Sequence, residues 1–172
     1  MITLHIDKPI FKSDARTIVN TVNCVGVMGK GIALECKNRY PKLFEDYVEK
    51  CKQKEIKIGS LWMYQQDSDY HILNFPTKEH WRDNSKQEFI MHGLDSFTKS
   101  YEKFECHSVS FPLLGASNGK LEPHWVLIVM VYYLKKVNIP VGIFISQKQL
   151  NQIIKNMDFH EFIKNNNIII NR

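Results

Sequence analysis

The 172-residue chain lacks several features that would assign it to a specialised class of protein. Its longest apolar runs, residues 125–134 and 141–146, are too short to cross a bilayer, and its N-terminus lacks the layout of a secretory signal. Its four cysteines, Cys24, Cys36, Cys51 and Cys106, show neither C-x-x-C spacing nor a matching histidine pattern. This argues against a zinc site and against a disulfide framework. We therefore expect a cytoplasmic protein that binds no metal and no membrane.

The chain also has little that would suggest disorder or a modular array. It contains no internal repeat, no linker and no run of five like charges. With 44% hydrophobic and 24% charged residues, its composition is that of an ordinary globular protein, and its length suits one domain. The net charge of +5 favours an anionic partner, either a phosphorylated ligand or a nucleic acid.

Strand-like and helix-like segments alternate along the chain. Predicted strands cover 2–6, 16–20, 61–65, 70–75, 108–111 and 141–146, with a hairpin turn at 66–69; predicted helices cover 31–39, 42–53, 85–103 and 122–136. Residues 147–172 are predicted as a peripheral helix followed by a frayed tail or a final edge strand at 168–170. This alternation predicts an α/β fold with a mixed sheet between helix layers, in which ligands bind at the carboxyl ends of the strands.

The first loop of chemical interest runs from Asn20 to Ala33, between a predicted strand and a predicted helix. Three glycines, Gly26, Gly29 and Gly31, remove side chains where the backbone could approach a ligand closely. Backbone amides at a helix start favour phosphate. The spacing matches neither the Walker A motif nor G-x-G-x-x-G, so a plain glycine-rich turn remains an equal alternative at this point.

Two further loops follow predicted strands. Residues 111–121 again offer small residues and free amides, which suits a diphosphate held from two sides, although Asn-Gly turn chemistry alone would also explain them. Residues 74–82 place Lys78 just beyond a buried strand, where its amine could be held near a reacting carbon. For Lys78 a solvated surface role is the ordinary alternative. His80 and Arg82 could contact an anionic substrate or could form surface ion pairs.

Together these three segments resemble the macrodomain family. Residues 18–33 resemble its opening motif, and residues 74–82 and 112–121 fall where that family keeps its catalytic segment and second phosphate loop. The likeness extends in order over residues 1–146, and it is strongest to the macrodomains of DarG-type antitoxins, close to the human terminal ADP-ribose glycohydrolase. It implies a three-layer α/β/α fold that binds ADP-ribose. Residues 147–172 would be a C-terminal extension that packs on this domain or trails from it.

The resemblance further implies an activity. DarG-type macrodomains remove ADP-ribose from thymidine bases of DNA by hydrolysing an N-glycosidic bond, and they thereby reverse a partner DarT-like toxin. We accordingly expect ADP-ribosylated single-stranded DNA as the substrate, ADP-ribose as the product, no cofactor, and a monomer. Two alternatives stay open: an ADP-ribose-binding module without turnover, and a hydrolase of protein-linked ADP-ribose or O-acetyl-ADP-ribose.

Site residues are carried over by position. Lys78 matches the lysine that family members need for cleavage, acting either as a neutral amine that attacks the sugar or as an ammonium that stabilises the departing base. Asn23 would bind the distal ribose hydroxyls. The residues expected to bind ADP-ribose are Asn20, Asn23, Gly26, Val27, Met28, Gly29, Gly31, Ile32, Thr77, Leu114, Gly115, Ala116, Ser117, Asn118 and Gly119.

The sequence departs from the family pattern in three places. Where many macrodomains have Gly-Asp after the first strand, this chain has Lys8-Pro9, so adenine would be read by backbone groups or by Asp7. Gly119 stands where the human relative has a catalytic aspartate. Residues 116–117 are alanine and serine in place of the usual glycine and cysteine, which would alter substrate access slightly.

Contacts to DNA are expected from the segment that follows Lys78. A modified thymidine must be presented unpaired or flipped, with its flanking phosphates near basic groups. His80, Trp81 and Arg82 are the candidate contacts to the flanking strand or base. For Trp81, burial as a packing residue is the stronger expectation from residue type alone.

Overall fold

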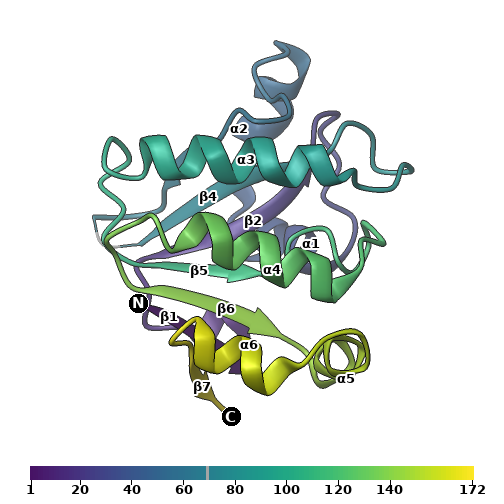
Figure 1. The fold of residues 1–172 in the computed structure, drawn as a ribbon. Helices are drawn as coiled ribbons and strands as arrows, with labels where there is room; N and C mark the ends of the chain where they lie inside the picture. The colour runs from purple at the N-terminus through teal and green to yellow at the C-terminus, as the bar shows by residue number, and fades with distance from the viewer. Residues whose placement is uncertain (69) are drawn as a thin grey trace.

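The computed structural model describes residues 1–68 and 70–172, and this part of the chain forms one seven-stranded sheet (Figure 1). The strands are β1 (Ile2–Ile6), β2 (Thr17–Asn23), β3 (Trp62–Gln65), β4 (His71–Lys78), β5 (Val109–Pro112), β6 (Val141–Ile145) and β7 (Ile169–Asn171). Their order across the sheet is β3-β4-β2-β5-β6-β1-β7. Only β3 runs antiparallel to its neighbour, so the sheet is mixed as predicted.

Helices cover both faces of this sheet. They are α1 (Gly31–Arg39), α2 (Pro41–Lys52), α3 (Gln87–Ser100), α4 (Pro123–Leu134), α5 (Gln147–Asn156) and α6 (Phe159–Asn165), and a 3₁₀ turn, η1, spans Ile10–Lys12. In Figure 1, α3 and α4 lie in front of the sheet and α1 lies behind it. The expected three-layer α/β/α fold is therefore confirmed.

Strand alternation explains the two cores. Successive side chains of β2 point to opposite faces, so Val19 enters the core beneath α3 and α4, whereas Ile18 and Val22 enter the core beneath α1 and α2. Leu73 and Ile72 divide in the same way on β4. Because both faces are covered by helices, the central strands are apolar along most of their length.

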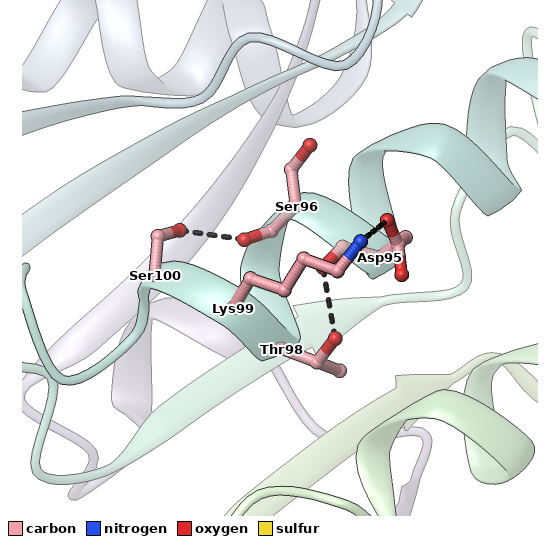
Figure 2. Close-up of polar contacts among 5 residues, drawn as sticks. All are labelled: Asp95, Ser96, Thr98, Lys99 and Ser100. Carbon is pink, nitrogen blue, oxygen red and sulfur yellow. Dashed lines mark hydrogen bonds and ion pairs between the residues drawn. The ribbon is translucent and has the colours of Figure 1, made fainter.

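In helix α3, buried apolar contacts contribute more to stability than the polar contacts on its surface. Its buried stripe consists of Phe89, Ile90, Gly93, Leu94 and Phe97. On the polar side Lys99 pairs with Asp95 at 2.6 Å, and the Thr98 and Ser100 hydroxyls donate to backbone carbonyls one turn earlier (Figure 2). An exposed pair at this spacing contributes only about 0.3–0.5 kcal/mol, whereas burying one large apolar side chain contributes roughly 1.5–3 kcal/mol. Packing therefore fixes the position of α3.

Two element ends differ from the sequence prediction in ways that matter for function. Strand β2 continues to Asn23 rather than ending at residue 20, because residues 21–23 keep pairing with β4. Strand β4 likewise continues to Lys78. At the other end of β4 the expected hairpin with β3 is present, with the Gln66 amide donating to the Tyr70 carbonyl at 3.0 Å. Asp69, part of the predicted hairpin turn, lies outside the described residues.

The C-terminal segment is more regular than predicted. It forms two helices, and the Asp158 side chain begins the second by accepting from the Glu161 amide at 2.9 Å. Strand β7 then pairs in parallel with β1, close to the predicted edge strand at 168–170. Apolar residues of α5 and α6 pack on the same core as α4.

Candidate functional site

Three loops meet at the carboxyl edge of the central strands. Strands β4, β2 and β5 are neighbours and run in parallel, so the loops that follow them emerge on one side of the sheet. We call them the β2–α1 loop (residues 24–30), the β4–α3 loop (residues 79–86) and the β5–α4 loop (residues 113–122). They contain or adjoin the glycine-rich and lysine-bearing segments that the sequence singled out.

Lys78 is the last residue of β4, and an irregularity in the strand precedes it. Val22 pairs with Pro76 and Asn23 pairs with Lys78, so buried Thr77 is the extra residue of a bulge. A bulge redirects the side chains around it and is frequent beside active sites. The Lys78 ammonium then donates to the Asn118 carbonyl at 2.7 Å, which joins the end of β4 to the β5–α4 loop.

The electrostatic surroundings of Lys78 disfavour its charged form. Burial of the ammonium is the main cause that lowers the pKa of Lys78, and the positive charges of Lys120 and Lys30 lower it further. The carboxylate of Asp83 acts in the opposite direction and raises the pKa. The net result is a lysine with a larger neutral fraction near neutral pH than a solvated one.

Asn23 organises the β2–α1 loop. Its Oδ1 accepts from the Val25 amide at 3.1 Å and from the Val27 amide at 3.3 Å, and its Nδ2 donates to the Val27 carbonyl at 2.6 Å. The hydroxyl of fully buried Tyr47, on α2, donates to the Asn23 carbonyl at 2.7 Å and lies 3.1 Å from Oδ1. The loop is thereby held at both its backbone and its side chain.

The β5–α4 loop folds around Ser85. The Ser85 amide donates to the Gly119 carbonyl at 3.0 Å, and a side chain added at Gly119 would collide with the Ser85 hydroxyl and the Gly115 carbonyl. Gly115 has a φ of +68°, which L side chains rarely adopt. An aspartate therefore does not fit at position 119 unless Ser85 and the Gly115 backbone both move.

The two glycine-rich loops also touch each other. Gly31, the first residue of α1, has a φ of +57°, and a Cβ there would lie 3.2 Å from Asn118 Nδ2. Asn118 thus contacts the start of α1 with its side chain and Lys78 with its carbonyl. The structure brings together Gly31 at the start of α1, Lys78 at the end of β4 and Asn118 of the β5–α4 loop.

The other predicted site residues are distributed unevenly around this centre. Asn20 is fully buried within β2, and its Nδ2 donates to Asn74 Oδ1 at 2.9 Å. Its own Oδ1 has no hydrogen-bond partner among the described residues. Met28 is buried in the core beneath α1, whereas Val27 is exposed on the β2–α1 loop. Asn20 and Met28 are therefore buried residues that pack beneath the β2–α1 loop rather than exposed ones.

Around the edge nearer α5, two predicted residues have protein partners. The Ser117 hydroxyl accepts from Gln149 Nε2 at 3.1 Å. Asp7 follows β1 and accepts from the Gln147 amide at 3.1 Å, so it caps the start of α5 together with Ser146. The expected contact between Asp7 and adenine stays a prediction.

Sequence reasoning missed two residues that shape the site. Tyr47 lies within the predicted helix 42–53, and the signal available there is that a buried tyrosine hydroxyl needs a partner. Ser85 carried no signal, because its role depends on the absence of a side chain at Gly119.

Within the described residues no group of three histidine, cysteine, aspartate or glutamate side chains could hold a metal ion. No helix in that part of the chain is long and apolar enough to span a membrane.

The chain is similar to known DNA ADP-ribosyl glycohydrolases in sequence and to solved DarG macrodomains in fold. The chain is 46% identical over 116 residues, 66% of its length, to the DNA ADP-ribosyl glycohydrolase of Mycobacterium tuberculosis, of which the match covers 33%. The macrodomain of Mycobacterium tuberculosis DarG superposes with a TM-score of 0.79 at 40% identity, covering 84% of this chain and 97% of that one. Thermosipho africanus DarTG in complex with ADP-ribose matches with a TM-score of 0.79 at 32% identity, covering 85% and 42%.

The matches to curated full-length relatives are partial, since they cover about a third of those proteins. The solved macrodomain, by contrast, is covered almost completely. Residues 19–130, which include most of β2, Lys78 and the β5–α4 loop, match the Macro domain family over more than half of the chain. The chain therefore belongs to the Macro domain family.

Proposed function

We propose that this chain binds ADP-ribose and hydrolyses the N-glycosidic bond that joins it to thymidine bases of DNA. The proposal is supported by the likeness to proteins named DNA ADP-ribosyl glycohydrolase, one of them 46% identical, and by the site itself. The observation that carries it is the position of Lys78, whose ammonium reaches the Asn118 carbonyl between two glycine-rich loops. ADP-ribose held by those loops would place its distal sugar beside this amine.

The loops supply the binding chemistry. The glycines of the β2–α1 loop let its backbone approach a diphosphate closely, and the start of α1 adds a favourable dipole. The β5–α4 loop closes from the opposite side with residues 114–119. One N–H of Asn23 Nδ2 serves Val27, and the second is available to a ribose hydroxyl. Positioning of the sugar by these groups would supply much of the rate enhancement.

Lys78 has two routes to cleavage. As a neutral amine it attacks the anomeric carbon, the bond to the base nitrogen breaks, the base departs with the electron pair, and water later releases the sugar. As an ammonium it donates a proton to the departing base while water attacks the anomeric carbon. The lowered pKa of Lys78 in the ligand-free protein favours the first route, and the charge of a bound diphosphate favours the second.

The biological setting proposed is that of an antitoxin. The similar structure from Thermosipho africanus is of DarTG in complex with ADP-ribose. By analogy we propose a DarT-like DNA ADP-ribosyltransferase as the toxin partner of this chain. We propose a monomer that needs no cofactor and acts on single-stranded DNA in the cytoplasm. We also propose that residues 147–172 extend the macrodomain of residues 1–146, because β7 pairs with β1 and Gln149 bonds Ser117.

A substrate panel tests this function. We expect release of ADP-ribose from an ADP-ribosylated thymidine oligonucleotide, with much slower turnover of glutamate-linked ADP-ribose and of O-acetyl-ADP-ribose. The measurement is ADP-ribose release by chromatography at equal substrate concentrations. Saturable ADP-ribose binding without turnover of any substrate would identify a binding module, and preference for the two esters would identify a different hydrolase.

The pH profile of this reaction reports on Lys78. If the neutral amine attacks, the rate rises with pH through the pKa of Lys78; if the ammonium donates a proton, the rate falls through it. Replacing Lys120→Gln removes a charge that lowers this pKa, so the lysine limb moves to higher pH in both cases. Lys155→Gln, an exposed lysine on α5, is the matched control. If the limb of the pH–rate profile does not move in Lys120→Gln, the limb reports the titration of a group other than Lys78.

A further inference from the structure

The segment that follows Lys78 has an exposed aromatic side chain, Trp81, that is not among the residues proposed to bind ADP-ribose. Trp81 keeps 43% of its surface exposed, which is unusual for a tryptophan and contradicts the expectation that it packs in the core. Its ring lies 5.6 Å from the His80 ring, with 28° between the two planes, and the Arg82 guanidinium lies 4.1 Å from its centre.

This stack is held in place by the backbone of the β4–α3 loop. The Arg82 amide donates to His80 Nδ1 at 3.2 Å, and the Asp83 amide donates to the His80 carbonyl at 3.1 Å, which closes a turn. On the two sides of the turn, Glu79 accepts from the Cys24 amide and Ser85 donates to Gly119. The exposed ring is therefore presented on an ordered turn only three residues after Lys78.

A hollow of about 430 Å³ lies beside the same turn. Its lining residues are Glu79, Arg82, Asp83, Asn84, Ser85, Lys86 and Phe89. Two carboxylates balance two cations there, so the hollow does not favour a phosphate group. Its wall includes the exposed Asn84 and the largely buried Phe89, together with the buried Ser85 hydroxyl, which has no hydrogen-bond partner among the described residues. These are features that suit a nucleobase.

The charge around the stack suits the backbone of a nucleic acid. Lys30, Lys120, Arg82 and Lys86 are all exposed. The charges of Lys30 and Lys120 act on Lys78, and Arg82 and Lys86 line the hollow with Glu79 and Asp83. Stacking on an exposed aromatic ring combined with a basic surround is the way in which proteins bind single strands without base pairing.

We infer that Trp81, with Arg82 and the adjoining hollow, forms a subsite for the nucleotide next to the modified thymidine in single-stranded DNA. This inference rests on the proposed function, since it assigns to that reaction a second contact with its polynucleotide substrate. The flanking base stacks on Trp81, and its phosphate lies outside the charge-balanced hollow, on the basic surface around it. The subsite makes an oligonucleotide a better substrate than the isolated modified nucleoside.

The test compares two substrates, an ADP-ribosylated thymidine oligonucleotide and ADP-ribosyl-thymidine itself. For Trp81→Ala we expect the ratio of their kcat/KM values to fall about tenfold, the loss of one base–aromatic stack. Trp81→Phe, which keeps a stacking ring, should restore most of the ratio. The control is Tyr132→Ala. Tyr132 is a 63% exposed aromatic residue on α4, and the ammonium of Lys136 lies 4.3 Å from the centre of its ring.

Binding of an unmodified thymidine oligonucleotide gives a readout that does not depend on activity. Its Kd should rise about tenfold for Trp81→Ala and stay unchanged for Tyr132→Ala. An unchanged ratio and Kd, or an equal loss on both substrates, would overturn the subsite. Failure of the wild type to cleave either substrate would refute the proposed function, while oligonucleotide binding would still decide the role of Trp81.

Discussion

Lys78→Ala is expected to reduce release of ADP-ribose from modified DNA by about 10³-fold or more, equivalent to roughly 4 kcal/mol of transition-state stabilisation. The reason is geometric. The Lys78 amine alone extends from the end of β4 to the Asn118 carbonyl, and both proposed routes to cleavage require it. Single-turnover kinetics with saturating enzyme would measure the loss in the chemical step.

Binding of ADP-ribose by Lys78→Ala should weaken by no more than about tenfold. The diphosphate is held mainly by backbone amides, and a partly exposed charge contributes about 1 kcal/mol or less. Calorimetry with ADP-ribose measures this directly. Lys155→Ala is the matched control, since Lys155 is an exposed lysine on α5 and its loss should leave turnover within severalfold. Near-normal turnover by Lys78→Ala would remove Lys78 from the mechanism.

Lys78→Arg separates the two routes that use this residue. Arginine keeps the positive charge but cannot supply a neutral amine, because its pKa lies far above the working range. Activity retained within about tenfold by Lys78→Arg would therefore favour electrostatic assistance, and a loss as large as that of alanine would favour nucleophilic attack. The same choice is read independently from the slope of the pH profile.

Much of this site was predictable because its parts lie in continuous segments. The glycines after β2, the lysine after β4 and the small residues after β5 each follow a strand, and parallel neighbouring strands must deliver them to one edge. The catalytic role of Lys78 was predicted from the resemblance of these same segments to macrodomains. In the structure Lys78 donates to the Asn118 carbonyl, and the Asn118 side chain lies beside Gly31.

What the sequence could not predict depends on contacts between distant segments. The exclusion of a side chain at Gly119 arises from Ser85, 34 residues earlier, and neither residue type signals the other. The exposure of Trp81 was missed for a related reason. Its identity favours burial, but a short turn beyond the strand end holds it outside both cores. The end of β2 was misplaced because Thr21 and Asn23 read as polar loop residues although they pair with β4.

Asn23→Ala is expected to weaken ADP-ribose binding by about 100-fold, or about 2.7 kcal/mol. The change removes the acceptor for the Val25 and Val27 amides and the donor to the Val27 carbonyl. Each hydrogen bond contributes roughly 0.5–1.5 kcal/mol, and the β2–α1 loop must then be ordered by the ligand itself. Calorimetry measures the affinity, and Asn38→Ala, an exposed asparagine on α1, is the control.

Tyr47→Phe distinguishes this loop effect from direct contact between Asn23 and the sugar. The variant leaves the Asn23 amide in place but removes the buried hydroxyl that donates to its carbonyl at 2.7 Å. If Asn23 acts by holding the loop, Tyr47→Phe should also weaken ADP-ribose, by about tenfold, although Tyr47 is too deeply buried to touch it. If only the direct contact counts, Tyr47→Phe should bind as the wild type does. A full effect of Asn23→Ala with none from Tyr47→Phe would therefore assign Asn23 to the ribose alone, and no effect from either would place the ligand elsewhere.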